Sequence, residues 1–75
     1  MILPTKHIPQ QEALIGVGAT LLRNLDVPRT VSGLWECVRT EPNVGTFERF
    51  ILAADFLYFV GAVKFSNGQL MRASR

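Results

Sequence analysis

The sequence predicts a small α+β fold in which three helices are followed by a C-terminal β-hairpin. Through most of the chain, apolar residues recur at spacings of three and four, which is typical of helices packed on a core. Near the end, Asn67-Gly68 separates two short segments that favour strands. Because 75 residues bury too little surface for two cores, we expect one domain over residues 9–75, preceded by an extended arm over residues 1–8.

The arm is expected because proline interrupts helices and central strands. Pro4 lies inside this first segment and Pro9 follows it directly. Ile2, Leu3 and Ile8 are apolar, so we expect the arm to lie against another apolar surface.

The first helix is expected from about Pro9, a favourable first helical residue, to about Leu25. Gly16 and Gly18 each lower its intrinsic stability by about 1 kcal/mol relative to alanine, so we expect them to let another backbone come close. The residues that recur at helical spacing in this segment are Leu14, Val17, Leu21, Leu22 and Leu25.

Two threonines mark the starts of the next two helices, because a threonine side chain accepts a hydrogen bond from an amide of the first turn. Thr30 precedes a second helix that is expected over residues 31–40. Thr46 precedes a third helix over residues 47–60, and Gly61 then ends it. One face of the second helix is expected to carry Val31, Leu34, Trp35 and Val38.

The last segment predicts a β-hairpin, because Asn-Gly is a preferred sequence for a two-residue type I′ turn. Such a turn at Asn67-Gly68 places Phe65 opposite Leu70. A short strand near residues 27–29 would precede the second helix. Three helices, this strand and the hairpin together predict a small winged helix-turn-helix domain.

The third helix is predicted to be apolar on two sides, which one small core cannot cover together. Beyond the expected core face, Leu52, Phe56 and Phe59 form a second apolar stripe, flanked by Glu48 and Asp55. Such a surface repels phosphate and exposes rings to water, so we expect a protein partner to cover it. Alternatively, the arm folds back over the stripe as additional core; the two arrangements are compatible. The expected core face consists of Phe47, Phe50, Ile51, Ala54, Leu57 and Tyr58.

The charge distribution gives little support for nucleic-acid binding. Eight basic and six acidic residues leave a net charge of +2, and the bases are spread along the chain rather than clustered. Arg29, Lys64 and Arg72 stand where a winged helix would contact a DNA backbone. We therefore expect any DNA binding to be weak or indirect.

The sequence contains no catalytic or metal-binding pattern. Cys37 is the single cysteine and His7 the single histidine, too few for an ordinary metal site or a supported nucleophile and base. We expect Cys37 to be a small buried residue, and the protein to be no enzyme and to need no cofactor. No apolar stretch reaches the roughly 20 residues of a membrane-spanning helix and no secretory pattern is present, so a cytoplasmic protein is expected.

Six short segments follow one another along nearly the whole chain. They are MILPTKHI at 1–8, LIGVGA at 14–19, TVSGLW at 30–35, TFERFILA at 46–53, LYFVGAV at 57–63 and NGQL at 67–70. In order and length they resemble the small middle component of bacterial ABC-three-component systems. The resemblance implies a winged-helix-type protein that links an SMC-like ABC ATPase to a separate effector, in systems thought to act against phages and plasmids. It carries over no catalytic residue.

Two functions follow as hypotheses. The first is a non-catalytic adaptor that links the ATPase to the effector of a defence complex. It would bury the third-helix stripe and the arm residues Ile2, Leu3 and Ile8 against a larger subunit. The second is a small winged-helix DNA-binding transcriptional regulator that uses the third helix and the hairpin. Self-association is also open, because an unpaired apolar stripe can meet its own copy.

Overall fold

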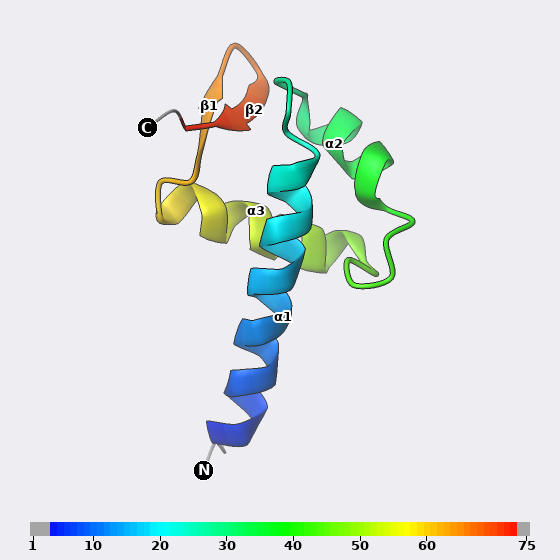
Figure 1. The fold of residues 1–75 in the computed structure, drawn as a ribbon, viewed down its shortest axis with the longest axis vertical. Helices are drawn as coiled ribbons and strands as arrows, with labels where there is room; N and C mark the ends of the chain where they lie inside the picture. Colours follow the sequence, from blue (N-terminus) through cyan, green and yellow to red (C-terminus); the bar gives the residue numbers. More distant parts are fainter. Residues whose placement is uncertain (1–3, 74–75) are drawn as a thin grey trace.

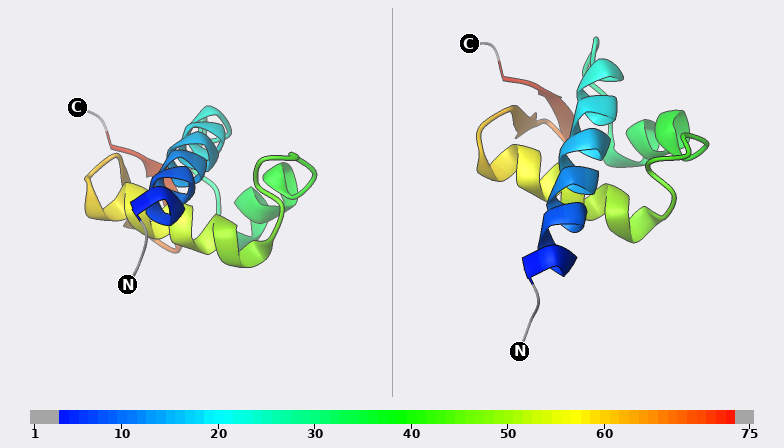
Figure 2. Two further views of the ribbon diagram at one scale, coloured as in Figure 1. Left: turned by 90° about the horizontal axis from the view of Figure 1, so that it is seen from below. Right: turned by 60° about the horizontal axis from the view of Figure 1, so that its bottom comes forward.

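The structure is a computed structural model that describes the backbone of residues 4–73 and the side chains of residues 12–73. The long helix α1 crosses α3, and the hairpin stands beside the C-terminal end of α1 (Figures 1 and 2). This arrangement confirms the α+β class, while the winged-helix assignment stays a prediction. The elements in chain order are α1 (Pro4–Arg23), α2 (Val31–Val38), α3 (Phe47–Phe59), β1 (Val63–Ser66) and β2 (Gln69–Arg72).

The N-terminal segment differs from the prediction, because α1 begins at Pro4. The first amides of a helix have no acceptor within it, so proline costs little in the first turn. Pro9 lies inside α1 without an N–H to donate to the carbonyl group of residue 5. That missing donor is why the sequence pattern placed the start of the helix at Pro9 instead.

The extended arm is therefore wrong for residues 4–8, and so is the alternative in which those residues fold back as an extended cover over the third helix. The boundary drawn between residues 8 and 9 falls within α1. Ile2 and Leu3 lie outside the described residues, and Ile8 lies in α1 with its side chain outside them.

One local and one distant side chain bond to the C-terminal end of α1. The Asn24 Nδ2 donates to the Thr20 carbonyl oxygen at 2.9 Å, and the helix ends before the predicted Leu25. Arg72 donates from Nε and Nη2 to the Leu22 carbonyl oxygen at 3.0 and 2.8 Å. Both carbonyl oxygens also accept a backbone amide, so these side chains add further donors at the helix end, and the Arg72 bonds tie β2 to α1.

The predicted N-caps of the next two helices are confirmed. Thr30 Oγ1 accepts a hydrogen bond from the Gly33 amide at 3.0 Å at the start of α2. Thr46 Oγ1 accepts one from the Arg49 amide at 3.1 Å at the start of α3. Each threonine satisfies an amide that has no acceptor within its helix, so the two starts are fixed locally.

A Schellman motif ends α3, with Gly61 in the left-handed region at φ 83° as the predicted stop. The Ala62 amide donates to the Leu57 carbonyl oxygen at 2.9 Å, and the Gly61 amide donates to the Tyr58 carbonyl oxygen at 3.1 Å. The chain therefore leaves the helix sharply and enters β1.

The hairpin has the predicted turn and register. Asn67 and Gly68 have φ values of 53° and 76°, as a type I′ turn requires, and Phe65 lies opposite Leu70. The predicted strand before α2 is present as a single bridge: the Arg29 amide donates to the Leu70 carbonyl oxygen at 3.0 Å, and the Leu70 amide donates back at 2.7 Å. The hairpin is thus held at its second strand by the segment that leads into α2.

The core lies where α1 crosses α3. A Cβ added at Gly18 of α1 would lie 3.2 Å from Leu57 Cδ2 of α3, so the predicted close approach is to a side chain and not to a backbone. Gly16 has no such neighbour, its nearest atom being Asn43 Nδ2 at 3.9 Å. The buried apolar residues are Val17, Leu21, Leu25, Leu34, Val38, Val44, Phe50, Ala53, Leu57, Val63 and Leu70.

Candidate interaction surface

The inner side of α3 is centred on Phe50, Ala53 and Leu57, which are at most 5% exposed. The predicted core face was rotated from this position, because Phe47 and Tyr58 are 49% and 61% exposed. The prediction from helical periodicity assumed that the centre of the broad apolar side of α3 faces the core. In the fold, the position of α1 sets that direction instead.

The α3 stripe, defined as Leu52, Phe56 and Phe59, lies at the surface. Its members are 53%, 37% and 87% exposed, as the sequence predicted for this side of the helix. Spacings of four and then three make them neighbours on one side, about a third of a turn from the buried residues. A contiguous group of large apolar side chains at the surface is typical of a site that another molecule covers.

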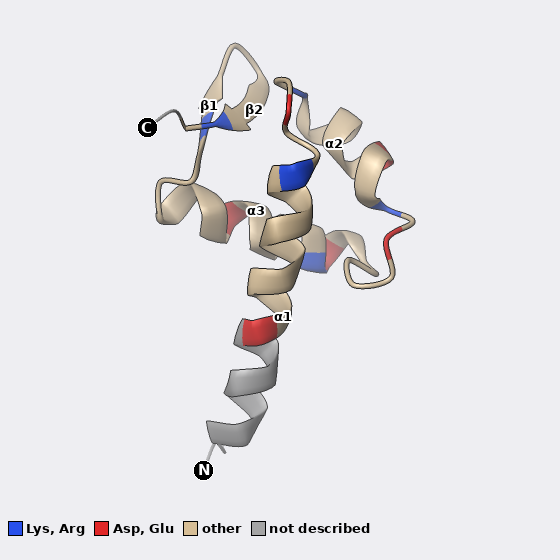
Figure 3. Cartoon of the chain, in the orientation of Figure 1, with Lys and Arg blue, Asp and Glu red and all other residues tan. Residues whose placement is uncertain are grey.

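The outermost side of α3 is acidic. Glu48 and Asp55 are seven residues apart, which places both roughly half a turn from the core, and both are exposed. The acidic positions of α3 are drawn in red in Figure 3. A helix that enters the major groove of DNA presents basic and amide side chains there. The nearest base, Arg49, instead directs Nη1 to the Asn43 carbonyl oxygen at 3.5 Å. The side of α3 that would face DNA therefore repels phosphate.

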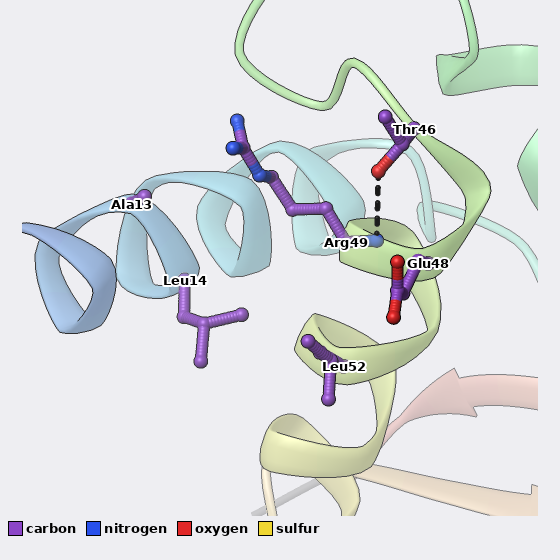
Figure 4. Close-up of a pocket in the computed structure, with 6 residues that line it drawn as sticks. All are labelled: Ala13, Leu14, Thr46, Glu48, Arg49 and Leu52. Carbon is purple, nitrogen blue, oxygen red and sulfur yellow. Dashed lines mark hydrogen bonds between the residues drawn. The ribbon is translucent and has the colours of Figure 1, made fainter. Parts of the chain in front are cut away.

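A cavity of about 360 Å³ lies between α1 and the first turns of α3 (Figure 4). Leu14 of α1 and Leu52 of α3 line its apolar part, while Thr46, Glu48 and Arg49 supply polar groups. Because Leu52 belongs both to this cavity and to the α3 stripe, the apolar surface is hollow at one end. A protruding side chain of a partner would fit there.

Two of the three candidate DNA-backbone contacts make hydrogen bonds within the protein. Arg29 Nε donates to the Asn24 carbonyl oxygen at 2.7 Å, and Arg72 donates twice to the Leu22 carbonyl oxygen. Lys64 is exposed and makes no ion pair within the part of the chain that the structure describes. The three bases therefore do not form one prepared phosphate site.

The expectation that Cys37 is buried is wrong, because its side chain is exposed on α2. Leu34 and Val38 occupy the inner side of that short helix, and Cys37 lies off it. The side chain of His7 is outside the described residues. Among residues that are described, no group of three or more His, Cys, Asp or Glu could hold a metal ion, and no helix is long and apolar enough to cross a membrane.

Sequence patterns did not indicate one further exposed ring. Phe65 of β1 is 54% exposed and, with Tyr58, forms a second apolar surface on the side of α3 that faces the hairpin. The position of Phe65 beside the turn could have indicated its exposure, because one face of a two-stranded sheet has little to cover it.

Fold and surface define a small α+β protein with one core and a contiguous apolar group exposed on its third helix. The family model described as "ABC-three component (ABC-3C) system Middle Component 6" matches residues 3–74. The chain therefore belongs to this family, as the resemblance of its sequence indicated, and a component of a multi-component system has protein partners. Searches among curated proteins and among solved structures gave no match.

Proposed function

We propose that the protein is a non-catalytic adaptor that links an SMC-like ABC ATPase to an effector component in a bacterial complex acting against phages and plasmids. The observation that carries the proposal is the exposure of Leu52, Phe56 and Phe59 on α3. In this proposal the stripe is buried against one of the larger subunits. Membership of a middle-component family supports the same role.

The energy of such a contact would come mainly from the rings. Phe59 is 87% exposed and Phe56 37%, so covering Phe59 removes most of a large apolar side chain from water. Anchoring aromatic residues that enter a partner's pocket each contribute about 2 kcal/mol or more. Leu52 and the adjoining cavity give the partner a second anchoring point.

The alternative function is a small winged-helix DNA-binding regulator. The order of the elements and the exposed Lys64 on the hairpin favour it. Against it stand the carboxylates of Glu48 and Asp55 on the outer side of α3. In this alternative, duplex DNA would bind tightly at physiological salt, with an affinity that falls steeply as salt rises.

The adaptor function is tested by co-expressing the full chain with the ATPase and effector encoded beside it and purifying through a tag on this chain. We expect both larger subunits to co-purify with the wild-type protein. Changing Phe59 to Ser should weaken binding of one subunit by about 30-fold or more, because an anchoring ring is removed. The variant should keep the wild-type circular dichroism spectrum and thermal transition.

A matched control is Ile15→Ser, which removes a 59% exposed apolar side chain from α1 outside the stripe and its cavity. We expect this variant to bind like the wild type. Failure of the wild-type chain to bind either subunit, together with tight binding of duplex DNA, would replace the adaptor by the regulator. A Phe59→Ser protein that is folded and binds normally would remove the stripe from the interface.

A further inference from the structure

A second concave surface lies on the hairpin side of α3. This hairpin groove has a volume of about 270 Å³ and is formed by the start of α2, the middle of α3 and the two strands. Its floor is fixed, because Leu70 is 7% exposed and its amide and carbonyl groups both bond to Arg29. The apolar and aromatic residues that line it are Val31, Ile51, Ala54, Tyr58, Phe65 and Leu70, and Asp55 lines it as well.

The hairpin groove and the α3 stripe are separate surfaces. At 100° per residue, Ile51 and Tyr58 lie about a quarter of a turn or more from Leu52 and Phe59, on the other side of the acidic edge of the helix. No residue of the stripe lines the groove. Asp55 lies between them, so one helix offers two apolar surfaces with a carboxylate at their boundary.

The chemistry of the groove indicates its occupant. Tyr58 and Phe65 remain 61% and 54% exposed, so they form walls that are not yet covered. The volume of about 270 Å³ is below the roughly 300–1,000 Å³ of sites for drug-sized ligands, and it suits one or two side chains. Asp55 is the one charged residue among the described residues that line the groove. An apolar side chain next to a lysine or arginine would complement these groups.

We propose that the hairpin groove, with Asp55 at its edge, docks a basic, apolar polypeptide segment of the second large subunit, while the α3 stripe binds the first. This inference rests on the proposed adaptor function. Two non-overlapping surfaces let one small chain contact two larger proteins at the same time. The carboxylate of Asp55 selects the charge of the segment, and the two rings hold its apolar side chain.

Other occupants fit less well. Nucleic acid would bring phosphate groups to Asp55. A second copy of this chain, docked groove to groove about a two-fold axis, would bring Asp55 towards the Asp55 of its mate. Like charges brought together in this way oppose association.

The test measures binding of the purified full-length chain to the separately purified ATPase and to the separately purified effector. A groove variant carries Tyr58→Ser and Phe65→Ser, a stripe variant carries Leu52→Ser and Phe59→Ser, and Ile15→Ser is the control. All changed side chains are more than half exposed, so the fold should persist, as circular dichroism melts will check. We expect each double variant to lose about 30-fold or more in affinity for one subunit, and a different one in each case.

The charge of the segment is tested by changing Asp55 alone. We expect Asp55→Arg to weaken binding of the subunit that the groove variant loses, Asp55→Asn to weaken it less, and added salt to weaken wild-type binding of that subunit. Both changes should weaken binding of the other subunit less, because Asp55 lines the groove and only borders the stripe. Normal binding by a folded Asp55→Arg protein would overturn the assignment of a basic segment.

The outcomes separate this inference from the adaptor function. If both double variants lose the same subunit while the other still binds, the second docking site is wrong and the adaptor stands. If the groove variant binds both subunits normally but is monomeric where the wild type is dimeric by light scattering, the occupant is a second copy. If the wild-type chain binds neither subunit, the proposed function itself fails.

Discussion

The two long sides of α3 have the same chemistry and opposite environments. Phe50 and Leu57 on the inner side are 0% and 5% exposed, whereas Leu52 and Phe59 on the α3 stripe are 53% and 87% exposed. Each of these two pairs consists of one leucine and one phenylalanine, so apolarity alone does not decide which side of α3 faces the core. The crossing of α1 over α3 decides it, because α1 covers one side and leaves the other open.

The largest expected difference between these sides is in stability. Phe50→Ala should lower the free energy of unfolding by about 3–5 kcal/mol, because it leaves a cavity in the core. A domain of this size has about 0.05–0.15 kcal/mol of stability per residue, or about 4–11 kcal/mol in all, so the loss would remove a large part of it. The same change at Phe59 should alter stability by less than about 0.5 kcal/mol. Urea unfolding of the two variants checks the contrast, and equal losses would mean that Phe59 is core.

A smaller effect tests whether the first turn of α3, which forms one wall of the cavity, is held by its cap. Thr46→Ala removes the acceptor for the Arg49 amide at 3.1 Å and should cost about 1 kcal/mol. Thr46→Ser keeps the hydroxyl group and should cost much less. Thermal denaturation of both variants gives the result; identical losses would show that the hydroxyl group is not what stabilises the turn.

The smallest effect concerns the inner side, at the contact between α1 and α3. Gly16→Ala should raise the free energy of unfolding by about 0.5–1 kcal/mol, because alanine favours the helix and no close atom opposes its Cβ. Gly18→Ala should gain less or lose stability, because its Cβ would lie 3.2 Å from Leu57 Cδ2. The difference between the two melting temperatures measures how tightly α1 packs, and a larger gain at Gly18 would contradict this packing.

The features that the sequence predicted well are those encoded locally. Thr30 and Thr46 cap helices by accepting from amides three residues away. The turn at Asn67-Gly68 depends on the positive φ values that these two residues adopt readily. Gly61 ends α3 for the same reason. The exposed α3 stripe was also predicted, because one small core cannot cover both sides of a helix with this pattern.

The features that it did not predict depend on distant contacts. Arg72 closes α1 through a bond to a carbonyl group 50 residues away, which no local pattern shows. The exposure of Phe47 and Tyr58 depends on where α1 packs, and the hairpin groove exists only because β1 stands beside α3. The start of α1 at Pro4 was missed for a different reason: two prolines close together resemble an extended segment, although the first of them suits a helix start.

The Schellman motif at Gly61 has a consequence for how firmly Phe59 is presented. The closing bonds pin the final turn of α3, so the backbone that carries Phe59, the most exposed ring among the described residues, is ordered before any partner arrives. In the proposed adaptor function, association would then cost little conformational entropy at this position, which is the benefit of preorganisation. On that proposal, loosening the turn would lower affinity even with every contacting atom unchanged.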